Sequence, residues 1–240
     1  MPLFSIIIPL YNCEKFIEAC LLSVLNQNFN NYEIIIINDC SKDRSLKICT
    51  KYKKKYPKIK IINHKTNKGV SSSRNLGIKS SNGEYIIFLD SDDYLENFSL
   101  YKLSKFIGNN KKADTIVVSH NANSDGKIFN KKITKINNND AKIKFINEIP
   151  YFVGYCWRFV AKRRFLETNK IFFMDDARQL EDEEFVCKLL FFSKSIVFFN
   201  EKYYFKRLQN HTGLASTTNF NSVKSCIVVL KGLLKLSSLK

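Results

Sequence analysis

Three carboxylates directly follow a run of apolar residues in "EYIIFLDSDDYLEN", residues 84–97. The run 85–89 is apolar enough to form a buried strand, and Asp90, Asp92 and Asp93 stand at its end. Side chains alternate in an extended segment, so Asp90 and Asp92 point to the same side. Two such carboxylates suit a hard divalent cation, Mg²⁺ or Mn²⁺, which keeps other positions open for water and phosphate oxygens. The alternative interpretation is a helix N-cap or an Asx turn.

A second acidic group stands in "LEDEEF", residues 180–185. One positioned carboxylate is enough to take a proton from an attacking hydroxyl, so this group could supply a general base. Acids in the first turn of a helix also interact favourably with the helix dipole, which is a purely structural reason for them. The residues alone favour the structural interpretation.

The elements that must position these acids are clearest in the first third of the chain. Apolar runs predict strands over 4–10, 32–38, 59–63 and 84–90, and helical patterns predict helices over 11–27, 40–56 and 69–81. Asn12 is expected as the N-cap of the first helix. Strands that are apolar throughout and separated by helices indicate a parallel sheet covered on both faces. Such sheets bind ligands beyond the carboxyl ends of their strands, where "YNCE", "NDCSKD" and "LDSDD" all fall.

The rest of the chain is less regular. Its patterns predict helices over 99–107, 141–149 and 180–194, a strand over 114–120, and a strand followed by a helix within 153–169. Further strands are expected within 195–207, and an amphipathic helix from about residue 219. That basic helix could rest on the inner-membrane surface, or it could pack on the domain or on a second subunit.

Composition excludes several classes of protein. The 240 residues are 45% hydrophobic and 25% charged, the balance of a soluble globular protein. No secretory signal is evident, and no apolar run approaches the ~20 residues that span a bilayer, so a cytoplasmic protein is expected. The seven cysteines form no CxxC pair, which argues against a zinc site. The formal charge of +17 attracts polyanions but does not identify one.

The ordered set of motifs "FSIIIPLYN", "NDCSKD", "GVSSSRN", "LDSDD" and "LEDEEF" resembles the family 2 inverting glycosyltransferases of the GT-A fold. The resemblance implies an α/β fold with a Rossmann-like, mostly parallel central sheet flanked by helices. It implies a nucleotide-sugar half (1–105) and an acceptor-binding half with the base (106–218), which the amphipathic helix predicted from its pattern (219–240) follows. It also implies transfer of a sugar, usually from a UDP-sugar, to a hydroxyl of a glycan or lipid-linked glycan, as in capsule or lipopolysaccharide synthesis.

The same resemblance assigns roles to residues of the nucleotide half. Asp39 matches the acid that hydrogen-bonds the uracil ring, although Asn38 and Cys40 depart from the family's usual neighbours. Asp92 matches the residue that ligates Mn²⁺ or Mg²⁺ directly. The other donor-site residues implied are Pro9, Tyr11, Asn12, Arg74, Asp90 and Ser91.

In the acceptor half, the resemblance makes Asp182 the general base and Glu183 its substitute. Arg207 and His211 fall in a segment like the family's closing loop, where basic residues touch the diphosphate. Trp157 could stack on a sugar or pack in the core. His64 looks incidental.

Two rival hypotheses remain. A nucleotidyltransferase could use a related fold and a metal, but "PLYNCEKF" lacks the glycine-rich phosphate loop it would need. A nucleic-acid or other polyanion binder would suit the charge, yet no recognisable module is present, so no nucleic-acid partner is expected. The sequence does not indicate an oligomeric state.

Overall fold

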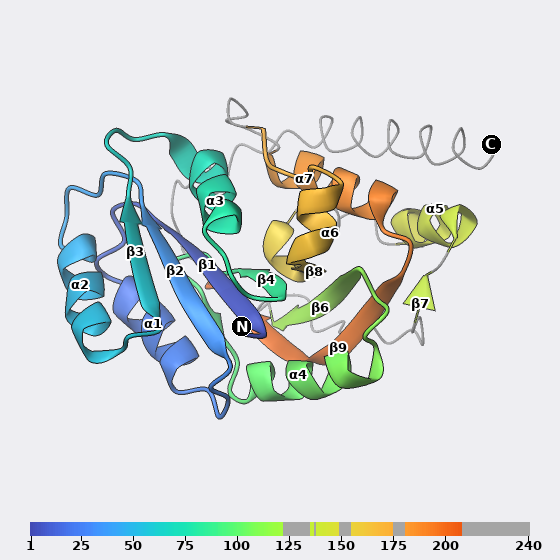
Figure 1. The fold of residues 1–240 in the computed structure, drawn as a ribbon, viewed down its shortest axis with the longest axis horizontal. Coiled ribbons are helices and arrows are strands. Elements are labelled where there is room, and N and C mark those ends of the chain that lie inside the picture. The colour runs from blue at the N-terminus through green and yellow to red at the C-terminus, as the bar shows by residue number, and fades with distance from the viewer. Residues whose placement is uncertain (122–134, 137, 149–154, 175–180, 208–240) are drawn as a thin grey trace.

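The structure is a computed structural model, which describes residues 1–121, 135–136, 138–148, 155–174 and 181–207. Within these residues, one nine-stranded sheet runs through the molecule in the order β3-β2-β1-β4-β8-β6-β9-β5, with β7 beside β9 (Figure 1). The predicted helix over 219–240 lies outside the described residues.

The first half of the sheet is parallel, as the sequence predicts. The strands β1 (Phe4–Leu10), β2 (Tyr32–Asn38) and β3 (Ile59–Asn63) have the predicted bounds, whereas β4 (Tyr85–Phe88) is shorter than the predicted 84–90. Ile6 of β1 lies opposite Ile34 of β2 and Ile87 of β4. These isoleucines are buried because helices cover both faces, which is why the strands are apolar throughout.

The second half of the sheet is mixed. Strand β8 joins it antiparallel to both β4 and β6, while β6 and β9 are parallel to each other. Most paired residues of the whole sheet are in parallel pairs, so the predicted fold class is confirmed. The strands of this half are β5 (Tyr94–Leu95), β6 (Thr115–Asn121), β7 (Lys135–Ile136), β8 (Phe159–Lys162) and β9 (Ile196–Phe205).

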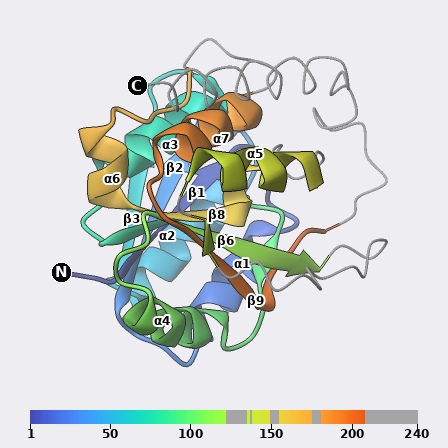
Figure 2. The same cartoon turned by 90° about the vertical axis from the view of Figure 1, so that its right-hand side faces the viewer.

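Helices form two layers around the sheet. Figures 1 and 2 show α3, α6 and α7 on one side and α1, α2 and α4 on the other. Helix α3 lies close to β1 because Gly77 faces Ile7, where any β-carbon would lie 2.3 Å from an Ile7 methyl. The helices are α1 (Ile17–Leu25), α2 (Ser45–Lys55), α3 (Gly69–Lys79), α4 (Ser99–Asn109), α5 (Asn139–Glu148), α6 (Arg163–Thr168) and α7 (Glu181–Phe192).

The start of α1 corrects one prediction. The helix begins at Ile17 and its N-cap is Phe16, so Asn12 does not cap it. Asn12 has a φ of 48°, in the left-handed region that asparagine tolerates better than most residues. The chain therefore turns after β1 before the helix can begin.

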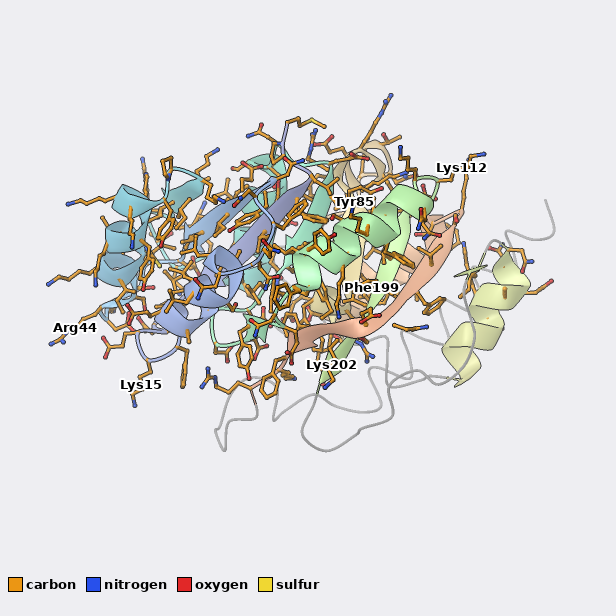
Figure 3. The ribbon with its side chains drawn as sticks, turned by 90° about the horizontal axis from the view of Figure 1, so that it is seen from below. Lys15, Arg44, Tyr85, Lys112, Phe199 and Lys202 are labelled. Atoms are coloured by element: carbon orange, nitrogen blue, oxygen red, sulfur yellow. The ribbon has the colours of Figure 1, made fainter. Side chains whose placement is uncertain are left out.

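Several charged side chains lie at the periphery of this core. Figure 3 shows Lys15, Arg44 and Lys112 reaching outward, whereas the labelled Tyr85 and Phe199 lie within the packed side chains near α4. Among the described residues, no helix is both long enough and apolar enough to cross a bilayer.

Candidate active site

The loops after β1, β2 and β4 meet at one edge of the sheet, because these strands are parallel neighbours. Asn12 joins the first two loops: its Oδ1 accepts the Lys42 N–H at 2.8 Å, and its N–H donates to Ser41 Oγ at 3.2 Å. A pocket of about 300 Å³ opens beside this junction. It is lined by Asn12, Cys13, Glu14, Lys15, Phe16 and Asp43.

Asp39, at the end of β2, is held by donors from the start of α3. Its Oδ1 accepts the Lys68 N–H at 2.7 Å, and its Oδ2 accepts the Gly69 N–H at 2.8 Å. Gly69 has a φ of +85°, a conformation that glycine adopts without strain. His64 Nδ1 lies 2.8 Å from Oδ1 and must carry the proton, since a carboxylate only accepts. A carboxylate offers about four acceptor positions, so Oδ2 keeps one for a ligand N–H.

Arg74 of α3 joins the two acidic motifs that lie far apart in the sequence. Its Nη2 donates to Asp90 Oδ1 at 2.9 Å, and its Nη1 donates to Asp182 Oδ1 at 2.7 Å. The guanidinium is buried, with 5% of its side chain exposed. Burial alone would lower the pKa of Arg74, but Asp182 and Asp90 raise it well above its usual value. The planar fork of arginine is what allows one cation to hold both carboxylates.

Asp182 lies in the first turn of α7 and is the less exposed member of the Asp90–Asp182 pair. Its Oδ2 accepts the Cys156 N–H at 3.3 Å, and 15% of its side chain is exposed. Burial raises the pKa of Asp182; Arg74 opposes that rise and Asp90 adds to it. A carboxylate with a raised pKa and one exposed edge is suited to accepting a proton.

Residues 90–93 form a tight turn closed by the Asp93 N–H, which donates to the Asp90 carbonyl at 3.1 Å. Strand β5 begins directly after the turn, and α4 begins only at Ser99. The helix-cap alternative for these acids is therefore wrong. Asp93 turns into the protein, where Tyr204 and the Arg207 N–H donate to its two oxygens. Burial and the neighbouring Asp90 raise the pKa of Asp93 to about 7.

The donor set tests whether a divalent cation fits this turn. Asp90 uses Oδ1 for Arg74, and no described residue bonds its Oδ2. Asp92 is the second carboxylate of the turn, although residues 90–93 are not the extended segment from which a shared orientation of Asp90 and Asp92 is predicted. Burial raises the pKa of Asp92 and Asp90 adds to it, while Lys206 and Arg207 oppose the rise. Among the described residues, no cluster of three or more His, Cys, Asp and Glu side chains could hold a metal ion. The two carboxylates fit a cation whose other ligands are water and phosphate oxygens.

The other predicted site residues lie nearby, with one exception. Tyr11 is 49% exposed after β1, Pro9 lies within β1, and Ser91 lies in the turn of residues 90–93. The guanidinium of Arg207 lies 5.0 Å from the Phe16 ring centre, and its Nε donates to the Asp92 carbonyl. His211 lies outside the described residues.

Trp157 does not face a ligand. It is 2% exposed and lies between the rings of Tyr155, at 5.2 Å, and Tyr204, at 4.3 Å. The sugar-stacking interpretation of Trp157 is therefore wrong, and core packing is confirmed. Tyr155 is the outer ring of the stack, with Lys206 Nζ 4.3 Å above it.

Sequence reasoning missed two side chains of this site. His64 was considered incidental, yet it holds Asp39 and directly follows β3 at the same edge of the sheet. The strand-end rule that located Asp39 would also have located His64. Tyr204 had no such signal, because nothing in a continuous run of strand residues marks the one whose hydroxyl reaches a distant turn.

Comparison with known proteins agrees with this geometry. The model of glycosyl transferase family 2 matches residues 5–189, so the chain belongs to that family. The uncharacterized glycosyltransferase EpsJ of Bacillus subtilis is 35% identical over 77% of this chain and 55% of its own length. The poly(ribitol-phosphate) beta-glucosyltransferase of Bacillus spizizenii is 35% identical over 88% of this chain and 33% of its own. The chain thus spans about half or less of these curated relatives.

A solved structure extends the likeness to the fold. Staphylococcus aureus TarS, residues 1–349 in complex with UDP-GlcNAc, matches with a TM-score of 0.79 and 27% identity. The match covers 96% of this chain and 66% of that one. The predicted GT-A architecture is confirmed.

Proposed function

We propose that this chain transfers a sugar from a UDP-sugar to an acceptor hydroxyl, with inversion at the anomeric carbon. The observation that carries the proposal is Arg74, which holds Asp90 of the turn and Asp182 of α7 on one guanidinium. The donor-side acid and the proposed base are thereby fixed next to each other, as a direct displacement between two bound substrates requires.

The donor would lie along the edge formed by the loops after β1, β2 and β4. The acceptor position left on Asp39 Oδ2 suits the N–H of a uracil ring. Pro9, Tyr11 and Asn12 would border the nucleoside, and Asp90 and Asp92 would hold Mn²⁺ or Mg²⁺ near the diphosphate. Such a cation supplies Lewis-acid neutralisation of the leaving diphosphate. Arg207, close to Asp92, is placed to add positive charge at the same side.

Asp182 would take the proton of the acceptor hydroxyl. Arg74 and the Cys156 N–H fix its two oxygens, so the carboxylate is oriented before substrate arrives. Burial favours its protonated form, which increases its tendency to accept a proton. Attack from the face opposite the departing diphosphate inverts the anomeric carbon, by the geometry that distinguishes inverting from retaining hydrolases.

The relatives suggest the class of substrate. TarS is solved with UDP-GlcNAc, and the Bacillus spizizenii relative is named for a poly(ribitol-phosphate) acceptor. We therefore propose a UDP-sugar donor and a surface-glycan or polyol-phosphate acceptor. The nucleotidyltransferase and polyanion-binder hypotheses gain no support from the family match.

Calorimetric titration of UDP tests the donor site. We expect binding in Mn²⁺ and its loss in EDTA or in Asp92→Ala. Glu201→Gln is the matched control, because Glu201 is an exposed acid of β9 that pairs with the exposed Lys102. Binding that survives both EDTA and Asp92→Ala would refute the metal-bridged donor site. A panel of UDP-sugars would then identify the donor.

A further inference from the structure

Tyr204 of β9 lies behind the turn of residues 90–93 and contacts it through its hydroxyl. We propose that Tyr204 is a positioning residue that fixes this turn so that Asp90 and Asp92, and not Asp93, face the cation. The inference rests on the proposed function, because it concerns the same donor site.

Two hydrogen bonds determine which way the hydroxyl points. The Asp90 N–H donates to the Tyr204 oxygen at 3.2 Å, so the hydroxyl hydrogen remains for Asp93 Oδ2, which lies 2.8 Å away. Tyr204 is 0% exposed, so water does not compete for either bond. One hydroxyl therefore holds the backbone of the first acid and the side chain of the third.

Arg207, three residues after Tyr204, forms two further hydrogen bonds to the turn. The Arg207 N–H donates to Asp93 Oδ1 at 2.7 Å, and Arg207 Nε donates to the Asp92 carbonyl at 3.1 Å. Both oxygens of Asp93 are thus engaged inside the protein. Asp93 is therefore the acid whose carboxylate anchors the turn, and it differs in this from Asp90 and Asp92, the two acids proposed to face the cation.

Packing fixes the ring that carries this hydroxyl. The Tyr204 ring stacks on Trp157 at 4.3 Å with an angle of 12° between the rings, and Tyr204 pairs with Leu95 between β9 and β5. Trp157 follows Cys156, whose N–H holds Asp182. The Trp157–Tyr204 stack therefore connects the turn to the segment that orients the proposed base.

Tyr204→Phe removes the hydroxyl and keeps the ring. Its matched control is Tyr203→Phe, because Tyr203 is the adjacent, fully buried tyrosine and its hydroxyl has no hydrogen-bond partner among the described residues. Mn²⁺ affinity, measured by electron paramagnetic resonance without nucleotide, should fall about 10- to 100-fold in Tyr204→Phe, the usual cost of losing a partner that orients a metal ligand. Tyr203→Phe should bind Mn²⁺ as the wild type does.

A double variant separates positioning from stability. Tyr204→Phe leaves the buried Asp93 with one partner fewer, so the protein should also melt at a lower temperature. Adding Asp93→Asn removes that charge and should restore the melting temperature. Mn²⁺ affinity should stay low, because the Asp90 N–H still lacks its partner.

Each outcome has a distinct meaning. Wild-type affinity in Tyr204→Phe, an equal loss in Tyr203→Phe, or recovery of Mn²⁺ affinity together with stability in the double variant would overturn the role of Tyr204 alone. A wild-type protein that binds neither Mn²⁺ nor UDP would overturn both this role and the proposed donor site.

Discussion

Two acidic sites lie at the same edge of the sheet, and they are satisfied in different ways. Asp39 is held by three N–H donors: the backbone N–H groups of Lys68 and Gly69, and the ring of His64. The second site places Asp90 and Asp182 on one buried guanidinium, with two further carboxylates in the adjoining turn.

This difference indicates what each site can do. Backbone N–H groups at a helix start hold a carboxylate in a fixed place without needing a counterion. That arrangement suits recognition of a group whose charge does not change in the reaction, such as the uracil ring of the donor. The second site has more negative than positive charge close together, and the pKa values of Asp92 and Asp182 are raised. It can therefore take up a cation and a proton, which are the two changes in charge that the proposed reaction needs.

Replacing Arg74, the side chain that Asp90 and Asp182 share, should have the largest effect on stability. Arg74→Met removes a buried guanidinium that pairs with two partly buried carboxylates, so we expect a loss of about 3 kcal/mol in the free energy of unfolding. Urea denaturation measures it. The control is Lys102→Met, which breaks an exposed pair with Glu201 and should cost less than about 1 kcal/mol. Similar losses in the two variants would show that the ion pairs of Arg74 contribute no more to stability than an exposed ion pair does.

Removing the proposed base should affect chemistry without affecting donor binding. Asp182→Asn keeps an oxygen for Arg74 but accepts a proton poorly, so kcat should fall about 10²- to 10⁴-fold while the Kd for UDP stays within about twofold. Glu184→Gln is the control, since Glu184 pairs with Lys188 along α7. A wild-type kcat in Asp182→Asn would move the search to Glu183.

The sequence predicted the Asp39 site more completely than the Arg74 site. Strand ends place Asp39 and the turn of residues 90–93 at one edge, because parallel strands share a direction. Periodicity also located α7, but nothing local shows that Arg74, buried in α3, reaches an acid 108 residues away. That contact depends on how α7 packs over the sheet. For the same reason, the hydroxyl of Tyr204 and the burial of Trp157 could not be predicted.

Helix α7 carries a further buried acid beside Asp182, namely Glu183, which is 6% exposed. Burial raises the pKa of Glu183 from 4.5 to about 7, and Asp182 and Glu181 add to it. Because the folded-state pKa is the higher one, its stabilising contribution is complete below about pH 4.5 and disappears as pH rises through about 7. The free energy of unfolding of Glu183→Gln should therefore exceed that of the wild type by up to about 3 kcal/mol at pH 8, and should equal it at pH 4.

Urea denaturation of both proteins at several pH values measures this difference. If the free energies of unfolding of the two proteins change with pH in parallel from pH 4 to pH 8, Glu183 ionises in the folded protein without a loss of stability. A wild-type kcat in Glu183→Gln would in addition exclude Glu183 as the base.

The smallest effect is expected at the Asp39 site. His64→Leu removes one of three donors to Asp39, while the N–H groups of Lys68 and Gly69 continue to hold the carboxylate. One hydrogen bond contributes about 0.5–1.5 kcal/mol, so the Kd for UDP should rise about 2- to 10-fold, with kcat unchanged. Calorimetry on His64→Leu beside Asp39→Ala measures the difference. A loss in His64→Leu as large as in Asp39→Ala would mean that the imidazole, and not the helix start, holds the acid, and the contrast between the two sites would fail.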